Sequence, residues 1–190
     1  MNTPFKSFEG KPDLVEVVRL EEHDYWKPIL LDYIKSMVEE NNIKLNEKGY
    51  LYDYDLDTKI ARKYQWPFYQ AIFPYVEDLF QSYGLRLDVE EYKREGAPLP
   101  WFQQYFQSSD FGWHHHAGHF ACIYYLELPE SKEATEFLNF KNYVEEGDLI
   151  FFPTFLIHRS PVIRSNKRKT ILSLNLKGKV DRKLINNYRS

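Results

Sequence analysis

Histidines are concentrated in one short stretch of this chain. Four of the six fall between positions 114 and 119, and a fifth is His158. In an extended chain, residues i and i+2 point to the same side, so His114 and His116 would project together. Two such imidazoles can chelate one metal ion, and His158, which follows the strand-like run 147–153, is the candidate for the next ligand. The pattern predicts a three-histidine metal site, and imidazole suits iron, zinc, copper or nickel.

A basic segment follows His158. Arg168 and Thr170 share one side of the next expected strand. If that side faces inward, a guanidinium lies near the metal site, where it would be costly without an acidic partner. A small dicarboxylate would satisfy it through a bidentate pair. The other interpretation is a solvated arginine within the basic turn 164–169.

The elements that must position these side chains change type half-way along the chain. Apolar residues recur at helical spacing over 21–40 and from about 57 to 83, which predicts two amphipathic helices. Later apolar or alternating runs, bounded by turn residues, predict strands. These are 85–92, 101–107, 119–128, 135–140, 149–152 and 170–176. We therefore expect an α+β fold with a mainly helical part over 1–84 and a jelly-roll β-core over 85–178.

Length and composition limit the class of protein. A chain of 190 residues fits one domain over 1–190. The single cysteine, Cys122, excludes an internal disulfide framework and zinc sites that need two or more cysteines. A net charge of −3 argues against a nucleic-acid partner. We also expect no membrane partner and a cytoplasmic location, because no long apolar run and no secretory signal is visible; the oligomeric state stays open.

Several blocks around these histidines share their order and spacing with a known family. They are Trp113–His116, Ala121–Pro129, Thr135–Phe137, Glu146–Pro153, His158–Pro161 and Arg168–Ile171. Over roughly 100–176 they resemble the 2-oxoglutarate/Fe(II)-dependent dioxygenases of the prolyl-hydroxylase-like branch. The resemblance implies a cupin-like double-stranded β-helix with Fe(II) in its mouth and N-terminal buttressing helices. It also implies a hydroxylase that uses 2-oxoglutarate and O2 and releases succinate. As the substrate we expect a small molecule or a peptide side chain.

The resemblance also implies a ligand set, with one departure. His114 and His158 match the two histidine ligands, but His116 stands where the family has a carboxylate. An all-histidine triad, a carboxylate such as Asp110 or Glu136 from elsewhere, or an open position would each account for this. We favour the all-histidine triad, because His116 has the right spacing and side.

The cosubstrate residues are implied in the same way. Arg168 resembles the arginine that holds the distal carboxylate of 2-oxoglutarate, and Thr170 resembles the hydroxyl residue two places after it. Tyr125 and Tyr105 resemble tyrosines that contact the cosubstrate.

Two other functions remain open at this point. One is a cupin-type dioxygenase with three histidines that does not use 2-oxoglutarate, in which Arg168 would have no cosubstrate to hold. The other is a non-catalytic jelly-roll binding protein. His115 and His119 are neighbours of the site without an assigned role, or alternative ligands.

Overall fold

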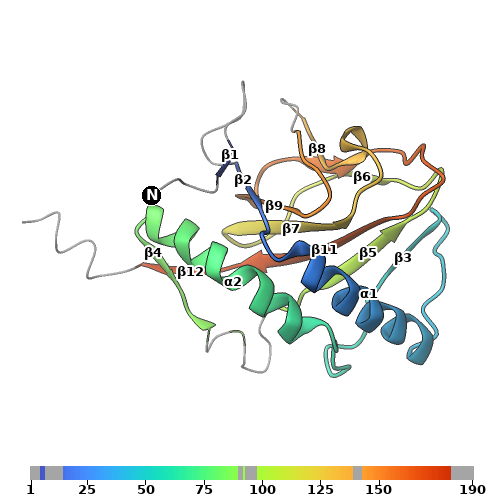
Figure 1. Ribbon diagram of the computed structural model, residues 1–190, viewed down its shortest axis with the longest axis horizontal. Helices are drawn as coiled ribbons and strands as arrows, with labels where there is room; N and C mark the ends of the chain where they lie inside the picture. Colours follow the sequence, from blue (N-terminus) through green and yellow to red (C-terminus); the bar gives the residue numbers. More distant parts are fainter. Residues whose placement is uncertain (1–4, 7–14, 90–91, 93–97, 139–142, 181–190) are drawn as a thin grey trace, which may run out of the picture.

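Two helices cover one face of a large sheet, and a smaller sheet lies across its other face (Figure 1). The computed structural model describes residues 5–6, 15–89, 92, 98–138 and 143–180. The helices are α1 (His23–Glu40) and α2 (Gln65–Ser82), with a short 3-10 turn at Ser131–Glu133. The strands are β1 (Phe5–Lys6), β2 (Glu16–Arg19), β3 (Tyr50–Tyr52), β4 (Leu85–Leu87), β5 (Trp101–Tyr105), β6 (Phe111–His114), β7 (Phe120–Glu127), β8 (Glu136–Phe137), β9 (Asp148–Pro153), β10 (His158–Ser160), β11 (Lys169–Leu176) and β12 (Gly178–Val180).

The pairings recorded between these strands are all antiparallel. The large sheet has the order β1-β2-β9-β7-β11-β5-β3, and the smaller one has the order β6-β10-β8. A third, two-stranded sheet joins β4 and β12. The predicted α+β class is confirmed, and two facing antiparallel sheets fit a jelly-roll core.

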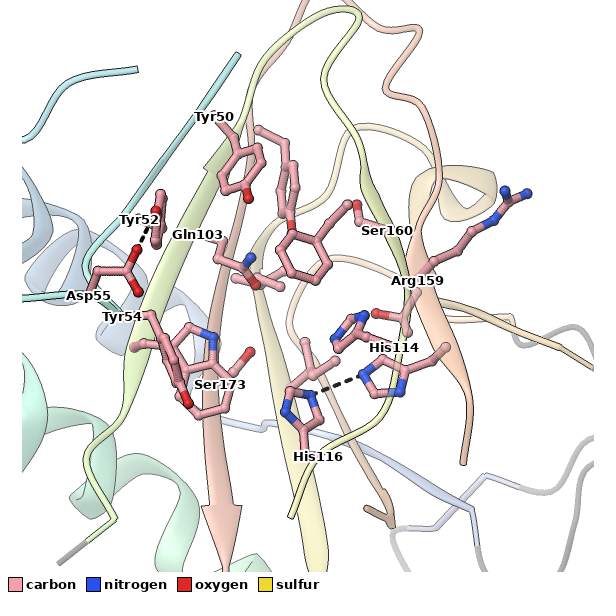
Figure 2. Close-up of a pocket in the computed structure, with 17 residues that line it drawn as sticks. Tyr50, Tyr52, Tyr54, Asp55, Gln103, His114, His116, Arg159, Ser160 and Ser173 are labelled. Atoms are coloured by element: carbon pink, nitrogen blue, oxygen red, sulfur yellow. Dashed lines mark hydrogen bonds between the residues drawn. The ribbon is translucent and has the colours of Figure 1, made fainter. Parts of the chain in front are cut away.

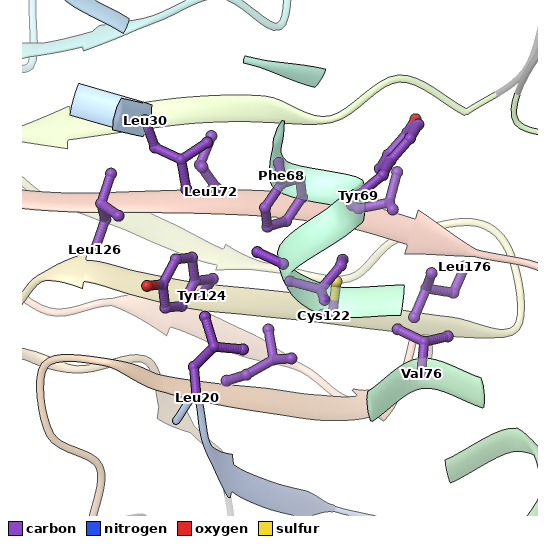
Figure 3. Packing of buried hydrophobic residues seen from close by; sticks show 14 of the residues in the cluster. Leu20, Leu30, Phe68, Tyr69, Val76, Cys122, Tyr124, Leu126, Leu172 and Leu176 are labelled. Atoms are coloured by element: carbon purple, nitrogen blue, oxygen red, sulfur yellow. The ribbon is translucent and has the colours of Figure 1, made fainter. Parts of the chain in front are cut away.

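The helix-facing side of the large sheet carries an apolar core (Figure 3). Helix α1 contributes Leu30 and Ile34, and α2 contributes Phe68 and Val76, all fully buried. Alternate residues of β7 and β11 meet them, because side chains of a strand point to opposite faces in turn. These are Cys122, Tyr124, Leu126, Leu172, Leu174 and Leu176.

The intervening residues of the same strands face the smaller sheet. Ala121, Ile123 and Tyr125 of β7, with Ile171 of β11, pack in a second core against Phe137 of β8. The candidate site lies at one end of this second core, between the two sheets.

The first part of the chain contributes more to the sheet than the sequence predicts. Strand β2 pairs with β9, and β3 pairs with β5, so the large sheet draws strands from both sides of residue 85. Strands of three or four residues are too short to show a period of two in the sequence. Of the expected strands, 85–92 and 135–140 each extend past the described residues.

Helix α2 begins at Gln65, later than its predicted start near 57. Asp53 explains the difference, because it gathers several donors around a fully buried carboxylate. Its Oδ1 accepts the amide of Phe102 at 2.9 Å, its Oδ2 accepts the Tyr64 hydroxyl, and its carbonyl accepts Arg62 Nη2 at 3.0 Å. These bonds hold the segment up to Tyr64 in turns. Within the described residues, neither helix combines the length and apolar character needed to cross a lipid bilayer.

Candidate functional site

The three predicted histidine ligands come together where β6 ends and β10 begins. Figure 2 shows His114 and His116 side by side in this cluster. His114 is the last residue of β6 and His158 the first of β10, and the two are direct partners across the strand pair. His116 follows two residues after His114. One ring nitrogen from each of the three histidines lies within 4.8 Å of the others.

Hydrogen bonds orient two of these rings. The Nδ1 of His114 lies 2.9 Å from the carbonyl of Gly112, and the Nδ1 of His158 lies 2.8 Å from that of Leu156. A carbonyl only accepts, so each Nδ1 carries the proton and each Nε2 carries a lone pair; that of His158 faces His116 Nε2. This is the arrangement by which metal-binding histidines are fixed in proteins.

The spacing of the nitrogens fits a single ion. His116 Nε2 and His158 Nε2 are 3.2 Å apart. Two nitrogens bound to one ion at about 2.1 Å, at an angle between 90° and 109°, are separated by about 3.0–3.4 Å. The donor set therefore suits a divalent transition metal.

Burial keeps these histidines neutral. The rings of Phe152 and Phe111 pack on His158 and His114, with centroids 4.7 and 4.6 Å away. Desolvation is the largest cause that lowers the pKa of His158 to about 3 and that of His116 to about 4, and it also lowers the pKa of His114. A neutral imidazole is the form that binds a metal, so the cluster is ready for one at neutral pH.

Thr154, which follows β9, holds the loop that carries His116. Its carbonyl accepts the amide of His116 at 3.0 Å, and its hydroxyl donates to the carbonyl of Gly118 at 2.7 Å. Gly118 has a φ of +120°, a backbone conformation that favours glycine. The loop therefore has a defined path, which places His116 beside the two strand histidines.

The alternative ligands lie elsewhere. Glu136 pairs with Arg159 at 2.7 Å, and Asp110 lines a separate hollow beside Glu133. Among the described residues, the ligand atoms that converge belong to His114, His116 and His158, so Glu136 and Asp110 are not part of the cluster. His115 and His119 are exposed and are not part of it either. The geometry favours His116 as the third ligand.

Arg168 is not brought to this cluster. Its guanidinium makes a bidentate pair with Glu127, at 2.7 and 2.9 Å, and its side chain is 37% exposed. Thr170 lies on the same side, where its hydroxyl donates to Glu127 and accepts from Gln104. The prediction that this side of the strand faces the metal site is therefore wrong.

Lys169 takes the inward position instead. Its side chain is fully buried, and its Nζ donates to the hydroxyl of Ser160 at 2.9 Å and to the carbonyl of Glu133 at 2.7 Å. The ammonium lies 5.0 Å from the centre of the Tyr105 ring. No salt bridge joins it to a carboxylate in the described part of the chain. The buried carboxylate of Glu133 attracts the ammonium, but desolvation is the larger effect and lowers the pKa of Lys169 to about 7. An ammonium has three donors, so one remains available.

The two tyrosines differ in their positions. Tyr105 lines the cavity that contains the histidines, and its contact with a cosubstrate stays a prediction. Tyr125 is buried behind it, and its hydroxyl accepts the amide of Thr135, which does line the cavity, at 3.0 Å. Burial raises the pKa of both hydroxyls, so both remain protonated.

Solved structures resemble this chain in fold, although sequence comparisons find no match. No protein-family model matches the sequence, and no curated protein does. Among solved structures, a prolyl-4-hydroxylase from Pseudomonas putida matches with a TM-score of 0.54 and 12% identity, over 86% of this chain and 92% of that one. The chain has a prolyl-hydroxylase-like fold.

Two further structures share this prolyl-hydroxylase-like fold. The non-heme α-ketoglutarate-dependent carbocyclase SnoK of nogalamycin biosynthesis matches with a TM-score of 0.57 and 8% identity, over 91% of this chain and 86% of that one. A prolyl hydroxylase from Trichoplax adhaerens, solved with a hypoxia-inducible-factor peptide, matches with a TM-score of 0.56 and 10% identity, over 90% and 87%.

Within this prolyl-hydroxylase-like fold, the site is a cavity of about 330 Å³, a volume typical of small-molecule sites. Several of its lining residues gave no signal in the sequence. They are Tyr50, Tyr52, Tyr54, Asp55, Gln103, Ser160 and Ser173. The first four come from β3 and the turn after it, which the sequence did not predict as part of the sheet. Ser173 and the buried Lys169 would have been found only if the inward side of β11 had been known, and Ser160 of β10 only through its hydrogen bond to Lys169.

Proposed function

We propose that this protein is an Fe(II)- and 2-oxoglutarate-dependent oxygenase. One arrangement carries the proposal: three neutral histidines converge in the cavity, and the buried ammonium of Lys169, which makes no salt bridge among the described residues, is hydrogen-bonded to Ser160 in the wall of the same cavity. A metal ion and a dicarboxylate would satisfy both features together. The fold shared with prolyl hydroxylases supports the same conclusion.

The three histidines would hold the iron. Three protein ligands leave positions for a bidentate 2-oxo acid and for O2, and the metal and the cosubstrate together supply the oxidising chemistry, with 2-oxoglutarate converted to succinate. Because His114, His116 and His158 add no negative charge, the site favours an anionic cosubstrate. Phe111 and Phe152, which pack on the rings of His114 and His158, exclude water from that side of the site.

Lys169 would hold the distal carboxylate. Ser160 lines the cavity and bonds the ammonium, so a carboxylate placed beside Ser160 would reach the same group. A charge-assisted pair there would offset the cost of the buried cation, which makes no direct salt bridge to a described carboxylate. Tyr105 lies over the ammonium and would form one side of this subsite. Arg168, already paired with Glu127, is left without this role.

The substrate would enter from the side of the cavity formed by β3 and β5. Tyr52, Tyr54 and Trp101 line that side and are not needed for iron or cosubstrate. We propose a small molecule or a peptide side chain as the group that is hydroxylated.

Anaerobic loading tests this function. Metal-free protein is given Fe(II) and then 2-oxoglutarate, and we expect a weak visible charge-transfer band, because the 2-oxo acid would chelate the iron. Replacing His158 by Ala is expected to lower Fe(II) affinity at least about 100-fold, while His115→Ala, in the adjacent exposed loop, serves as the matched control and leaves it unchanged. Iron bound without a band on addition of 2-oxoglutarate would contradict the proposal and favour a three-histidine dioxygenase that does not use this cosubstrate. Normal iron binding by His158→Ala would contradict the ligand set.

A further inference from the structure

One wall of the cavity is left unexplained by iron and 2-oxoglutarate. Tyr52, Tyr54, Asp55 and Trp101 line it, and Figure 2 shows the labelled members of this set on the opposite side from His114, His116 and Ser160. We call these four residues the β3 wall. It combines aromatic rings with one carboxylate, and both kinds of group attract cations.

Asp55 is a carboxylate without a cation. Its hydrogen-bond partner is the hydroxyl of Tyr52, and no ion pair involves Asp55 in the part of the chain that the structure describes. Because Tyr52 donates to Asp55, the hydrogen bond raises the pKa of Tyr52 to about 12, so the phenol stays a neutral donor at physiological pH. One phenol leaves most of the lone pairs of the carboxylate available.

The other charged side chain that lines the cavity is already neutralised. Arg159 pairs with Glu136 at 2.7 Å, and its guanidinium lies 4.5 Å from the centre of the Trp113 ring. Trp113 is exposed and does not line the cavity, so this cation is directed toward the outside. The net charge offered at the β3 wall is therefore the negative charge of Asp55.

Tyr54 and Trp101 form an aromatic corner beside this carboxylate. Their ring centroids are 5.3 Å apart and their planes meet at 78°. Tyr54 is 61% exposed although it lines the cavity, so much of its ring is accessible. Two rings at nearly a right angle next to a carboxylate provide the negative ring faces and the counter-charge that an ammonium group requires.

The aromatic corner also connects to the metal site. The ring of Trp101 lies 5.6 Å from that of His116, measured between centroids. A group held between Tyr54 and Asp55 therefore has an apolar surface, the Trp101 ring, along which a carbon chain can lie toward the histidines.

We propose that the β3 wall binds the ammonium group of an amine substrate, whose carbon chain extends along Trp101 toward His116. The proposal deepens the function proposed above and rests on it for the reaction, although the binding itself needs neither iron nor 2-oxoglutarate. The group that binds is a primary or alkylated ammonium. A free amine and a lysine side chain both carry such a group.

Calorimetry with full-length, metal-free protein tests the binding. The probes are cadaverine, Nα-acetyl-lysine methylamide, and the Nε-acetylated form of the second probe, which keeps the shape but lacks the charge. We expect at least one of the two charged probes to bind at least about tenfold more tightly than the acetylated one. The probe that binds distinguishes a small amine from a lysine side chain.

Substitutions make the test specific to the β3 wall. Asp55→Asn should weaken the charged probe about tenfold, and Trp101→Leu should weaken it as well. Asp57→Asn is the matched control, because Asp57 is exposed in the same segment, lies outside the cavity and bonds the amide of Lys59. Equal binding of the charged and acetylated probes, no binding of either charged probe, or equal effects of the two Asp→Asn changes would overturn the proposal. If an amine binds but Fe(II) and 2-oxoglutarate give no charge-transfer band, the amine site at the β3 wall is supported and only the proposed oxygenase function is contradicted.

Discussion

Strand β11 has two faces with different tasks. Leu172 and Leu174 face the helices, where they are fully buried in the apolar core. Lys169, Ile171 and Ser173 face the other way, toward the cavity and its surrounding residues. One strand therefore supplies packing on one side and chemistry on the other, and an offset of one residue decides which task a side chain has.

The adjacent cations Arg168 and Lys169 show the consequence most clearly. Arg168 is partly exposed and forms a salt bridge with Glu127, whereas Lys169 is fully buried and forms no salt bridge with any described residue. By residue type alone, Arg168 is the better candidate for holding a dicarboxylate. Its position outside the cavity removes that role, and the buried neighbour Lys169 is the cation that has no salt-bridge partner among the described residues.

The helix face should carry the larger share of stability. We expect Leu172→Ala to lower the free energy of unfolding by about 2–5 kcal/mol, because it removes buried methyl groups and leaves a cavity. Ser173→Ala, one residue along on the other face, is the control and should change it by less than about 1 kcal/mol. Urea denaturation measures both, and equal losses for the two variants would contradict the division between the faces.

The cavity face should carry cosubstrate affinity. Replacing Lys169 by Met removes one charge-assisted hydrogen bond, so 2-oxoglutarate should bind about 10–100-fold more weakly, which corresponds to about 1.5–3 kcal/mol. Arg168→Met is the matched control and should leave this affinity within about threefold, since the Arg168 guanidinium lies outside the cavity. Calorimetry under anaerobic conditions measures both, and a larger loss for Arg168→Met would reverse the assignment.

The smallest expected effect is the change of metal affinity with pH. A proton competes with a metal for each histidine, and burial holds the pKa of His158 at about 3 and that of His116 at about 4. Metal affinity should therefore fall only as pH approaches these low values, and should change by less than about threefold between pH 7 and 5.5. Exposed histidines with a pKa near 6.5 would begin to lose the metal across that interval. Calorimetric titration with Zn²⁺ at several pH values distinguishes the two, and a steep loss above pH 5.5 would contradict a buried site.

Periodicity predicted the parts of the fold that are long enough to show it. Helix α1 lies within the predicted range 21–40, and β7 and β11 lie close to their predicted ranges. The three histidines were identified because an i, i+2 spacing in an extended chain places two of them together. Short strands such as β3 and β10 have no such signal, and their positions depend on pairing with distant partners.

The inward side of β11 depends on such pairing as well. Thr170 pairs with Glu127 but Ile171 pairs with Tyr125, so the register shifts between them and one residue of β7 is bulged. The bulge turns Glu127 to the outer side, where it meets Arg168 and Thr170. A sequence that alternates regularly does not reveal a bulge, so it does not show that Glu127 pairs with Arg168 and Thr170, which were expected in the cavity because of the family resemblance.

The most direct test of this account is a crystal structure of the anaerobic complex with Fe(II) and 2-oxoglutarate. We predict iron bound by His114, His116 and His158, with the distal carboxylate of 2-oxoglutarate beside Lys169 and Ser160. A carboxylate side chain on the iron, or a distal carboxylate held by Arg168, would contradict it.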